Sequence, residues 1–292
     1  MTSFEEVLAR KTAIHDWLAR RVSAEATAWL EGAIAKYAAS GRYGDLAMAI
    51  GLAPRKLGKA ELALSDDEVR TGQELRRGLD TSDWSIDQAG RVLIVLASYM
   101  GDDQKFAATL DRLFQAGEIG EHIAILRGLP LYPAPELLIP RAAEGVRSAI
   151  QPVFEAVTHR NPFPKDHFDQ AQWNQMVLKA LFIGSKLAPI QGLDERRNPE
   201  LAATLMDYVH ERWAAGRAVS PELWRCVGPF TRREDLPDLV KALRGGEDAQ
   251  SAAAALALSE SMLPEAQEAL AVDTQLTARI KAKNITWNSI HF

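Results

Sequence analysis

Cysteine is nearly missing from this sequence, since Cys226 is the only one among 292 residues. A single cysteine cannot form an internal disulfide, and the N-terminus lacks the basic flank and apolar run of a secretory signal. We therefore expect a reducing, cytoplasmic location. Long apolar runs are also missing: the longest, residues 92–97, is far shorter than the roughly 20 residues that span a bilayer. No transmembrane segment is expected.

The sequence also lacks an excess of basic residues. Its 34 Lys and Arg residues stand against 39 Asp and Glu residues, which gives a net charge of -5 at pH 7. Such a chain offers few clustered cations to replace the counterions of a phosphate backbone, so no nucleic-acid partner is expected. Hydrophobic residues make up 47% of the sequence. This fraction can build a substantial core and excludes a disordered chain.

Stretches with the two-residue period of a β-strand are missing as well. Instead, apolar residues recur every three or four positions from Phe4 to Tyr37, which is typical of amphipathic helices. The same spacing predicts helices over residues 66–78, 85–100, 102–115, 119–126, 235–243, 249–261 and 264–280. The fold class is therefore predicted to be all-α.

Proline marks the start of three further helices. Pro135, Pro199 and Pro221 are each followed by Glu and Leu, and proline at the first helical position loses no N–H that the helix needs. The glutamate that follows suits the positive end of the helix dipole. Asn198 and Ser220 are the expected N-caps of the last two helices.

Residues 46–64 are expected to form irregular turns rather than a helix. Gly51, Pro54 and Gly58 interrupt this passage, and such residues break long helices. The next helix is expected to begin after Ser65, which is followed by three acids that favour the helix dipole.

A weak internal sequence similarity suggests a repeat of helix pairs. Residues 87–89 followed by 106–110 resemble residues 169–171 followed by 201–205. Short alanine-rich matches also arise from composition alone, so both explanations stay open. The helix order favours a single all-α domain over residues 1–292, built as a helical-repeat solenoid of the HEAT or armadillo type. Residues 284–292 are expected to form an extended tail that docks on the body or on a partner.

The central stretch, residues 159–230, contains the most unusual helix. From Trp173 onward its residues are apolar on nearly all sides, so this helix is expected to be buried nearly all round. Asn174, Gln175 and Lys179 would then lie away from solvent and need hydrogen-bonded or charged partners. They either satisfy nearby protein groups or bind a ligand.

The helix that begins at Pro199 supplies the other candidate ligand-binding residues. Asp207, His210 and Glu211 lie on one polar face, which suits acid–base chemistry, a metal or simply a solvated surface. The familiar zinc motif with two histidines is missing, so no metal is expected. Arg212 falls inside the apolar stripe. It is expected to be largely buried, held by a carboxylate or several backbone carbonyls, or else to bind an anionic ligand.

Four segments of the central stretch share the pattern of one known family. They are NPFP at residues 161–164, WNQMVLKALF at 173–182, DYVHERWAAGR at 207–217 and PELWR at 221–225. Together they resemble the EboA family of bacteria. The resemblance implies a protein encoded beside a UbiA-like prenyltransferase, a TatD-like hydrolase, a dehydroquinate-synthase-like protein and sugar-isomerase-like proteins. It links the chain to secondary-metabolite processing or export, and it implies no catalytic residue.

Two functions of different classes follow. The first is a noncatalytic helical-repeat protein that binds a partner protein of the same gene cluster or a small metabolite. The alternative is an enzyme or enzyme subunit that acts on a small, possibly prenylated, metabolite. A deep pocket formed by Asn174, Lys179, Asp207 and His210 would favour the enzyme, whereas an exposed groove or apolar patch elsewhere would favour the binding protein. No cofactor is expected.

Overall fold

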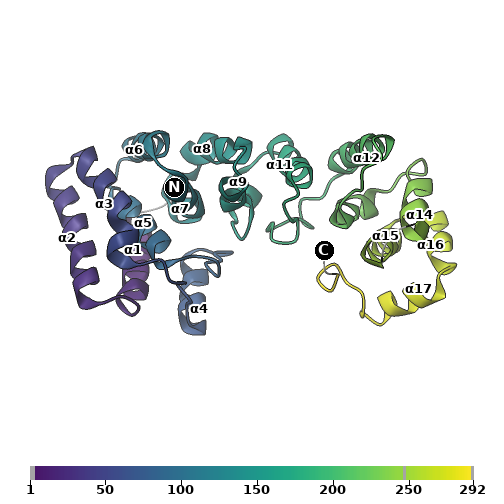
Figure 1. Ribbon diagram of the computed structural model, residues 1–292, viewed down its shortest axis with the longest axis horizontal. Coiled ribbons are helices and arrows are strands. Elements are labelled where there is room, and N and C mark those ends of the chain that lie inside the picture. The colour runs from purple at the N-terminus through teal and green to yellow at the C-terminus, as the bar shows by residue number, and fades with distance from the viewer. Residues whose placement is uncertain (1–3, 246–247, 291–292) are drawn as a thin grey trace. The chain divides into compact units, whose positions relative to one another are not determined.

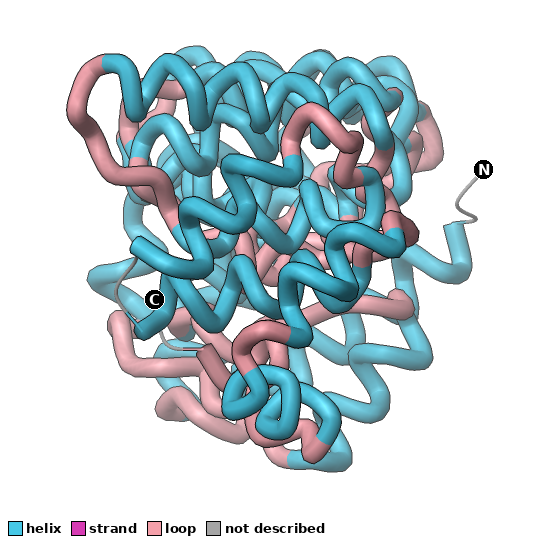
Figure 2. The backbone as a smooth tube through the Cα atoms, turned by 90° about the vertical axis from the view of Figure 1, so that its right-hand side faces the viewer, coloured by secondary structure: helices cyan, strands magenta, loops and turns pink. Residues whose placement is uncertain are grey.

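The computed structural model describes residues 4–245 and 248–290 (Figure 1). Over these ranges the chain forms α-helices and short 3-10 helices and no β-strand, as the helical colouring in Figure 2 shows. The predicted all-α fold class is confirmed. The chain divides into two compact units, Met1–Asp169 and Gln170–Phe292. A single domain over residues 1–292 stays a prediction.

The first unit is organised around a buried helix, α5 (Ile86–Ala97). All its residues except Gln88 are buried, and it packs against α1, α3 and α7. The helices of this unit are α1 (Phe4–Ala19), α2 (Ala24–Ser40), α3 (Tyr43–Leu57), α4 (Asp66–Leu75), α5, α6 (Asp103–Ala116), α7 (Ile119–Arg127), η1 (Leu129–Leu131), α8 (Pro135–Arg147), α9 (Gln151–Thr158) and α10 (Phe163–His167).

The prediction of irregular turns over residues 46–64 is wrong, because α3 continues to Leu57. Pro54 lies inside the helix and cannot donate to the carbonyl of Ile50, four residues earlier. That carbonyl instead accepts a hydrogen bond of 3.1 Å from Nε of Arg91, on α5. A long-range contact therefore offsets the local cost of the proline.

Other helix boundaries also differ from those predicted, and the predicted helix 85–100 ends at Ala97. The helix that follows Ser65 ends at Leu75 rather than at residue 78. The predicted helix 264–280 is divided in two, because the side chain of Asp273 accepts a hydrogen bond of 2.9 Å from the backbone N–H of Leu276 and starts a new helix there.

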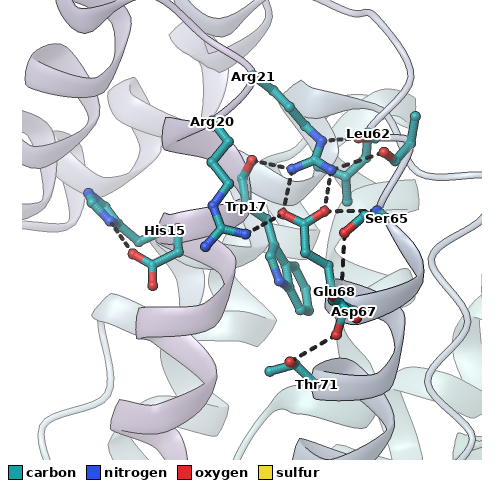
Figure 3. A network of polar contacts seen from close by, with 11 residues as sticks. His15, Trp17, Arg20, Arg21, Leu62, Ser65, Asp67, Glu68 and Thr71 are labelled. Atoms are coloured by element: carbon teal, nitrogen blue, oxygen red, sulfur yellow. Dashed lines mark hydrogen bonds and ion pairs between the residues drawn. The ribbon is translucent and has the colours of Figure 1, made fainter.

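Figure 3 shows how α4 is joined to the turn that follows α1 through the buried carboxylate of Glu68. The carboxylate accepts hydrogen bonds from Arg21, one of them 2.9 Å long, and from Arg20 at 3.0 Å. It also accepts the backbone N–H of Ser65 at 2.9 Å, which closes a capping box at the start of α4. The hydrogen bonds from Arg21 lower the pKa of Glu68 from its ordinary 4.5 to about 2, against the opposing effect of burial.

The second unit surrounds α15 (Asp248–Glu260), in which residues 252–258 are all buried. The other elements of this unit are α11 (Gln170–Ile183), α12 (Pro199–Ala214), η2 (Pro221–Leu223), α13 (Trp224–Val227), η3 (Gly228–Phe230), α14 (Leu236–Gly245), α16 (Pro264–Ala271) and α17 (Thr274–Lys281). The small alanines allow close approach: a Cβ added at Gly228 would lie 2.8 Å from Cα of Ala257.

The C-terminal tail docks on the second unit over its described residues, 284–290. Ile285 is buried against Ala252 and Leu256. The indole N–H of Trp287 donates a hydrogen bond of 2.6 Å to Glu260. Residues 291–292 of the predicted tail lie outside the described residues.

Candidate functional site

Asn174 lies in a paired-amide contact between two helices. Its side chain is buried, accepts a hydrogen bond of 2.9 Å from the amide of Asn198 and donates one of 3.3 Å in return. Asn198 in turn accepts the backbone N–H of Leu201 at 2.9 Å, which confirms it as the N-cap of α12. Asn174 therefore positions the start of α12.

The expectation that α11 is buried nearly all round is wrong. Trp173 and Met176 are fully buried, but Phe182 is 75% exposed. Gln175 is exposed and Lys179 half-buried. Within the second unit α11 packs on α12, and its surface is only partly buried.

The three polar candidates on α12 lie at the surface. Asp207, His210 and Glu211 are all exposed. Nε2 of His210 lies 2.7 Å from a carboxylate oxygen of Asp238, so this histidine links α12 to α14. Within residues 4–245 and 248–290, no three His, Cys, Asp or Glu side chains form a group that could hold a metal ion.

Arg212 is half-buried rather than largely buried, and its guanidinium donates to a single backbone carbonyl instead of a carboxylate or several carbonyls. Nε and Nη2 donate hydrogen bonds of 3.0 and 2.8 Å to the carbonyl oxygen of Ala218. Between the two residues the chain leaves α12 through Gly216, whose φ of +66° lies in the left-handed region. Arg212 thus fixes the loop that follows α12.

This loop forms one wall of a surface pocket of about 390 Å³, the α12–α14–α15 pocket. Trp213 forms another wall, and the ammonium of Lys241 on α14 lies 3.9 Å from the centre of its indole ring. The lining residues are Trp213, Ala218, Val219, Pro221, Lys241, Ala242, Gly245, Ala249 and Gln250. The pocket combines mainly apolar walls with one cation, a composition typical of small-molecule sites.

Glu222 joins η2 to the segment between α11 and α12. Its side chain is 4% exposed and accepts hydrogen bonds of 2.9 and 2.7 Å from the backbone N–H groups of Leu187 and Ala188. We expected this glutamate to favour a helix dipole and Ser220 to cap an α-helix. Both expectations need correction, because the segment is a 3-10 helix and Ser220 makes no side-chain cap hydrogen bond.

Cys226 is fully buried in α13, and burial raises the pKa of its thiol to about 12. Burial thus favours the neutral thiol, which is the poorly nucleophilic form of cysteine.

The predicted candidates make separate contacts instead of lining the α12–α14–α15 pocket. Asn174 binds Asn198, His210 binds Asp238 and Arg212 binds a loop carbonyl. Arg212 contributes to the pocket indirectly through Ala218. A ligand-binding role for the six candidates stays a prediction.

The fold and the pocket define an all-helical protein with a small, largely apolar surface site. The family model described as "Metabolite traffic protein EboA" matches residues 10–228, and the chain belongs to the EboA family. The match includes the α12 and loop walls of the pocket, whereas α14 and α15 lie beyond it. No curated protein and no solved structure matches the chain. Among the described residues, no helix has the length and apolarity to cross a membrane.

Proposed function

We propose that the protein is a noncatalytic helical-repeat protein that binds a small metabolite, or a partner protein of the same gene cluster, in secondary-metabolite processing or export. The family description, metabolite traffic, supports a metabolite-related role. Neighbouring helices pack in sequence order, such as α2 on α3, α8 on α9 and α14 on α15, and this supports a HEAT- or armadillo-like repeat. The observation that carries the proposal is the α12–α14–α15 pocket.

The size and lining of this pocket favour a small ligand with a flat apolar body. Its volume of about 390 Å³ lies within the range of about 300–1,000 Å³ that is common for such sites. Trp213 offers a broad apolar face, and Lys241 offers a cation for an anionic or carbonyl group. The contact between their side chains contributes only about 0.5–1 kcal/mol at an exposed site, so a ligand can displace the ammonium from the ring.

The contacts of the predicted polar residues favour binding over catalysis. Asn174, Lys179, Asp207 and His210 do not line this pocket. The residues on which the enzymatic alternative depends therefore do not converge in this apolar site.

Recovery of the bound molecule tests the proposal. The tagged protein is purified from cells that carry the gene cluster, and molecules released by denaturation are identified by mass spectrometry. Ala249→Phe is designed to fill the pocket, whereas Ala214→Phe adds the same side chain at an exposed position of α12 outside the pocket lining. We expect one small molecule to accompany the wild type and Ala214→Phe but not Ala249→Phe.

The same purification distinguishes the other outcomes. A cluster-encoded protein that is retained by the wild type and lost with Ala249→Phe would identify a protein partner instead of a metabolite. Equal recovery of one ligand with both variants would show that the ligand binds elsewhere. Chemical conversion of the recovered molecule by the pure protein would contradict the noncatalytic role.

A further inference from the structure

A second pocket lies in the first unit, where four separate segments meet. Its volume is about 290 Å³. Arg10 comes from α1, Arg76 follows α4, and Asp166 and His167 come from α10. The remaining lining residues are Leu129, Pro130, Tyr132 and Pro135. Charged side chains therefore meet an apolar rim in what we call the Arg10–Arg76 pocket.

The NPFP segment, which the α12–α14–α15 pocket does not use, holds in place the helix α10 that supplies Asp166 and His167 to the Arg10–Arg76 pocket. The buried amide of Asn161 donates hydrogen bonds of 3.1 and 3.0 Å to the carbonyls of Leu126 and Ala156. Its oxygen accepts the backbone N–H of Phe163 at 3.0 Å, at the start of α10. The ring of Phe163 is buried, with its centre 4.6 Å from that of His167. These contacts hold α10, and with it Asp166 and His167, in place.

The two arginines are held mainly by backbone carbonyls. Nη1 of Arg10 donates to the carbonyl of Leu131 at 2.9 Å. Arg76 donates to the carbonyls of Pro130 at 3.2 Å and Arg77 at 2.8 Å, and it pairs with Asp166. Carbonyls orient a guanidinium group without neutralising its charge.

Of the two arginines, Arg10 has the less complete set of hydrogen-bond partners. Its side chain is 8% exposed, and Nε has no hydrogen-bond partner in the described part of the chain. Burial lowers the pKa of Arg10, the charge of Glu6 opposes this effect, and the charge of Arg76 adds to it. A buried guanidinium beside a second guanidinium favours an additional anion.

We infer that the Arg10–Arg76 pocket binds an oxyanion, the carboxylate or phosphate group of a small molecule. The planar N–H donors of guanidinium match the oxygens of both groups. Leu129, Pro130 and Pro135 would contact the apolar part of the molecule. This site uses no residue of the α12–α14–α15 pocket, so the inference does not depend on the proposed function.

Calorimetric titration with two probes tests the site and distinguishes its ligand. Inorganic phosphate and benzoate are added separately to the full chain at constant ionic strength set by chloride. Arg10→Gln and Arg76→Gln each remove one pocket cation. Arg70→Gln, on α4, removes an exposed cation outside the pocket and is the matched control.

We expect at least one probe to bind and each pocket substitution to weaken it at least about tenfold, because charge-assisted hydrogen bonds are lost. Arg70→Gln should leave the affinity unchanged. Binding of phosphate alone would identify a phosphate site, and binding of benzoate alone would identify a carboxylate site with an apolar rim. Failure of both probes to bind, or equal affinity of Arg10→Gln and the wild type, would overturn the inference.

If Arg10→Gln does not fold, the pKa of His167 in the wild type tests whether the pocket binds an anion. Burial lowers the pKa of His167; Asp166 and Glu136 oppose this effect, and Arg76 adds to it. An anion bound beside the ring would stabilise the imidazolium and raise this pKa by about half a pH unit. The imidazole signal, assigned with His167→Gln, is followed by NMR with and without each probe. An unchanged pKa at saturating concentrations of both probes would also overturn the inference.

Discussion

Replacing Glu68 by glutamine is expected to destabilise the protein by about 2–3 kcal/mol at pH 7. Glutamine keeps the volume of the side chain but removes the charge that Arg21 and Arg20 share. The fall in the pKa of Glu68 from 4.5 to about 2 corresponds to roughly 3 kcal/mol. Solvent screens part of the network, because the side chain of Arg20 is 65% exposed, and this sets the lower end of the range.

The destabilisation caused by Glu68→Gln should depend on pH in a defined direction. The pKa of Glu68 is lower in the folded chain than its ordinary 4.5, so the stabilisation by its carboxylate is fully present above that value. It is lost as the pH falls toward the folded pKa of about 2. Urea unfolding followed by circular dichroism at pH 7, 5 and 3 should therefore show a difference between wild type and variant that shrinks at pH 3.

The neighbouring carboxylate provides a matched control for Glu68. The side chain of Asp67 is 83% exposed and pairs with the exposed Arg70. Asp67→Asn should change the free energy of unfolding by no more than about 0.5 kcal/mol. A loss below about 0.5 kcal/mol for Glu68→Gln, or an equal loss at pH 7 and pH 3, would refute the reasoning.

Three further predictions concern the second unit. Gly228→Ala should lower the free energy of unfolding, measured in urea, by about 1–3 kcal/mol, because the added Cβ would meet the backbone of α15. Gly44→Ala, whose Cβ would have nothing within 4 Å, should not destabilise the protein. Equal effects of the two substitutions would contradict the packing argument. Trp287→Phe removes the hydrogen bond to Glu260 and should speed amide exchange in residues 284–290; unchanged exchange would show that apolar contacts alone hold the tail. Cys226 should resist iodoacetamide at pH 7.5 and react fully in urea, since burial raises its pKa to about 12; rapid reaction in the native protein would disprove that protection.

Local contacts explain most of what could be predicted from the sequence. Ser65 caps α4 and Asn198 caps α12 with hydrogen bonds to residues three positions away, so their effect is visible in a short segment. Pro199 likewise begins α12 because its missing N–H costs nothing at that position. The all-α fold follows from such signals and from the helical spacing of apolar residues.

Contacts between distant segments explain the errors. Pro54 remains inside α3 because Arg91, which is 37 positions further along, satisfies the carbonyl that the proline leaves free. Glu222 follows a proline at a helix start, yet it binds backbone N–H groups of a loop more than 30 positions earlier. No local pattern distinguishes these residues from ordinary ones.

The sequence by itself determined the helical class and the family, and it drew attention to the central stretch that contains Trp213 and Pro221. Only the tertiary structure brought Lys241 and Ala249 to that segment and placed Arg10 in a separate pocket. Helix formation depends on neighbours within a few positions, which the sequence displays directly. A pocket depends on which helix faces pack together, and that choice is made by the burial of apolar surface over the whole unit.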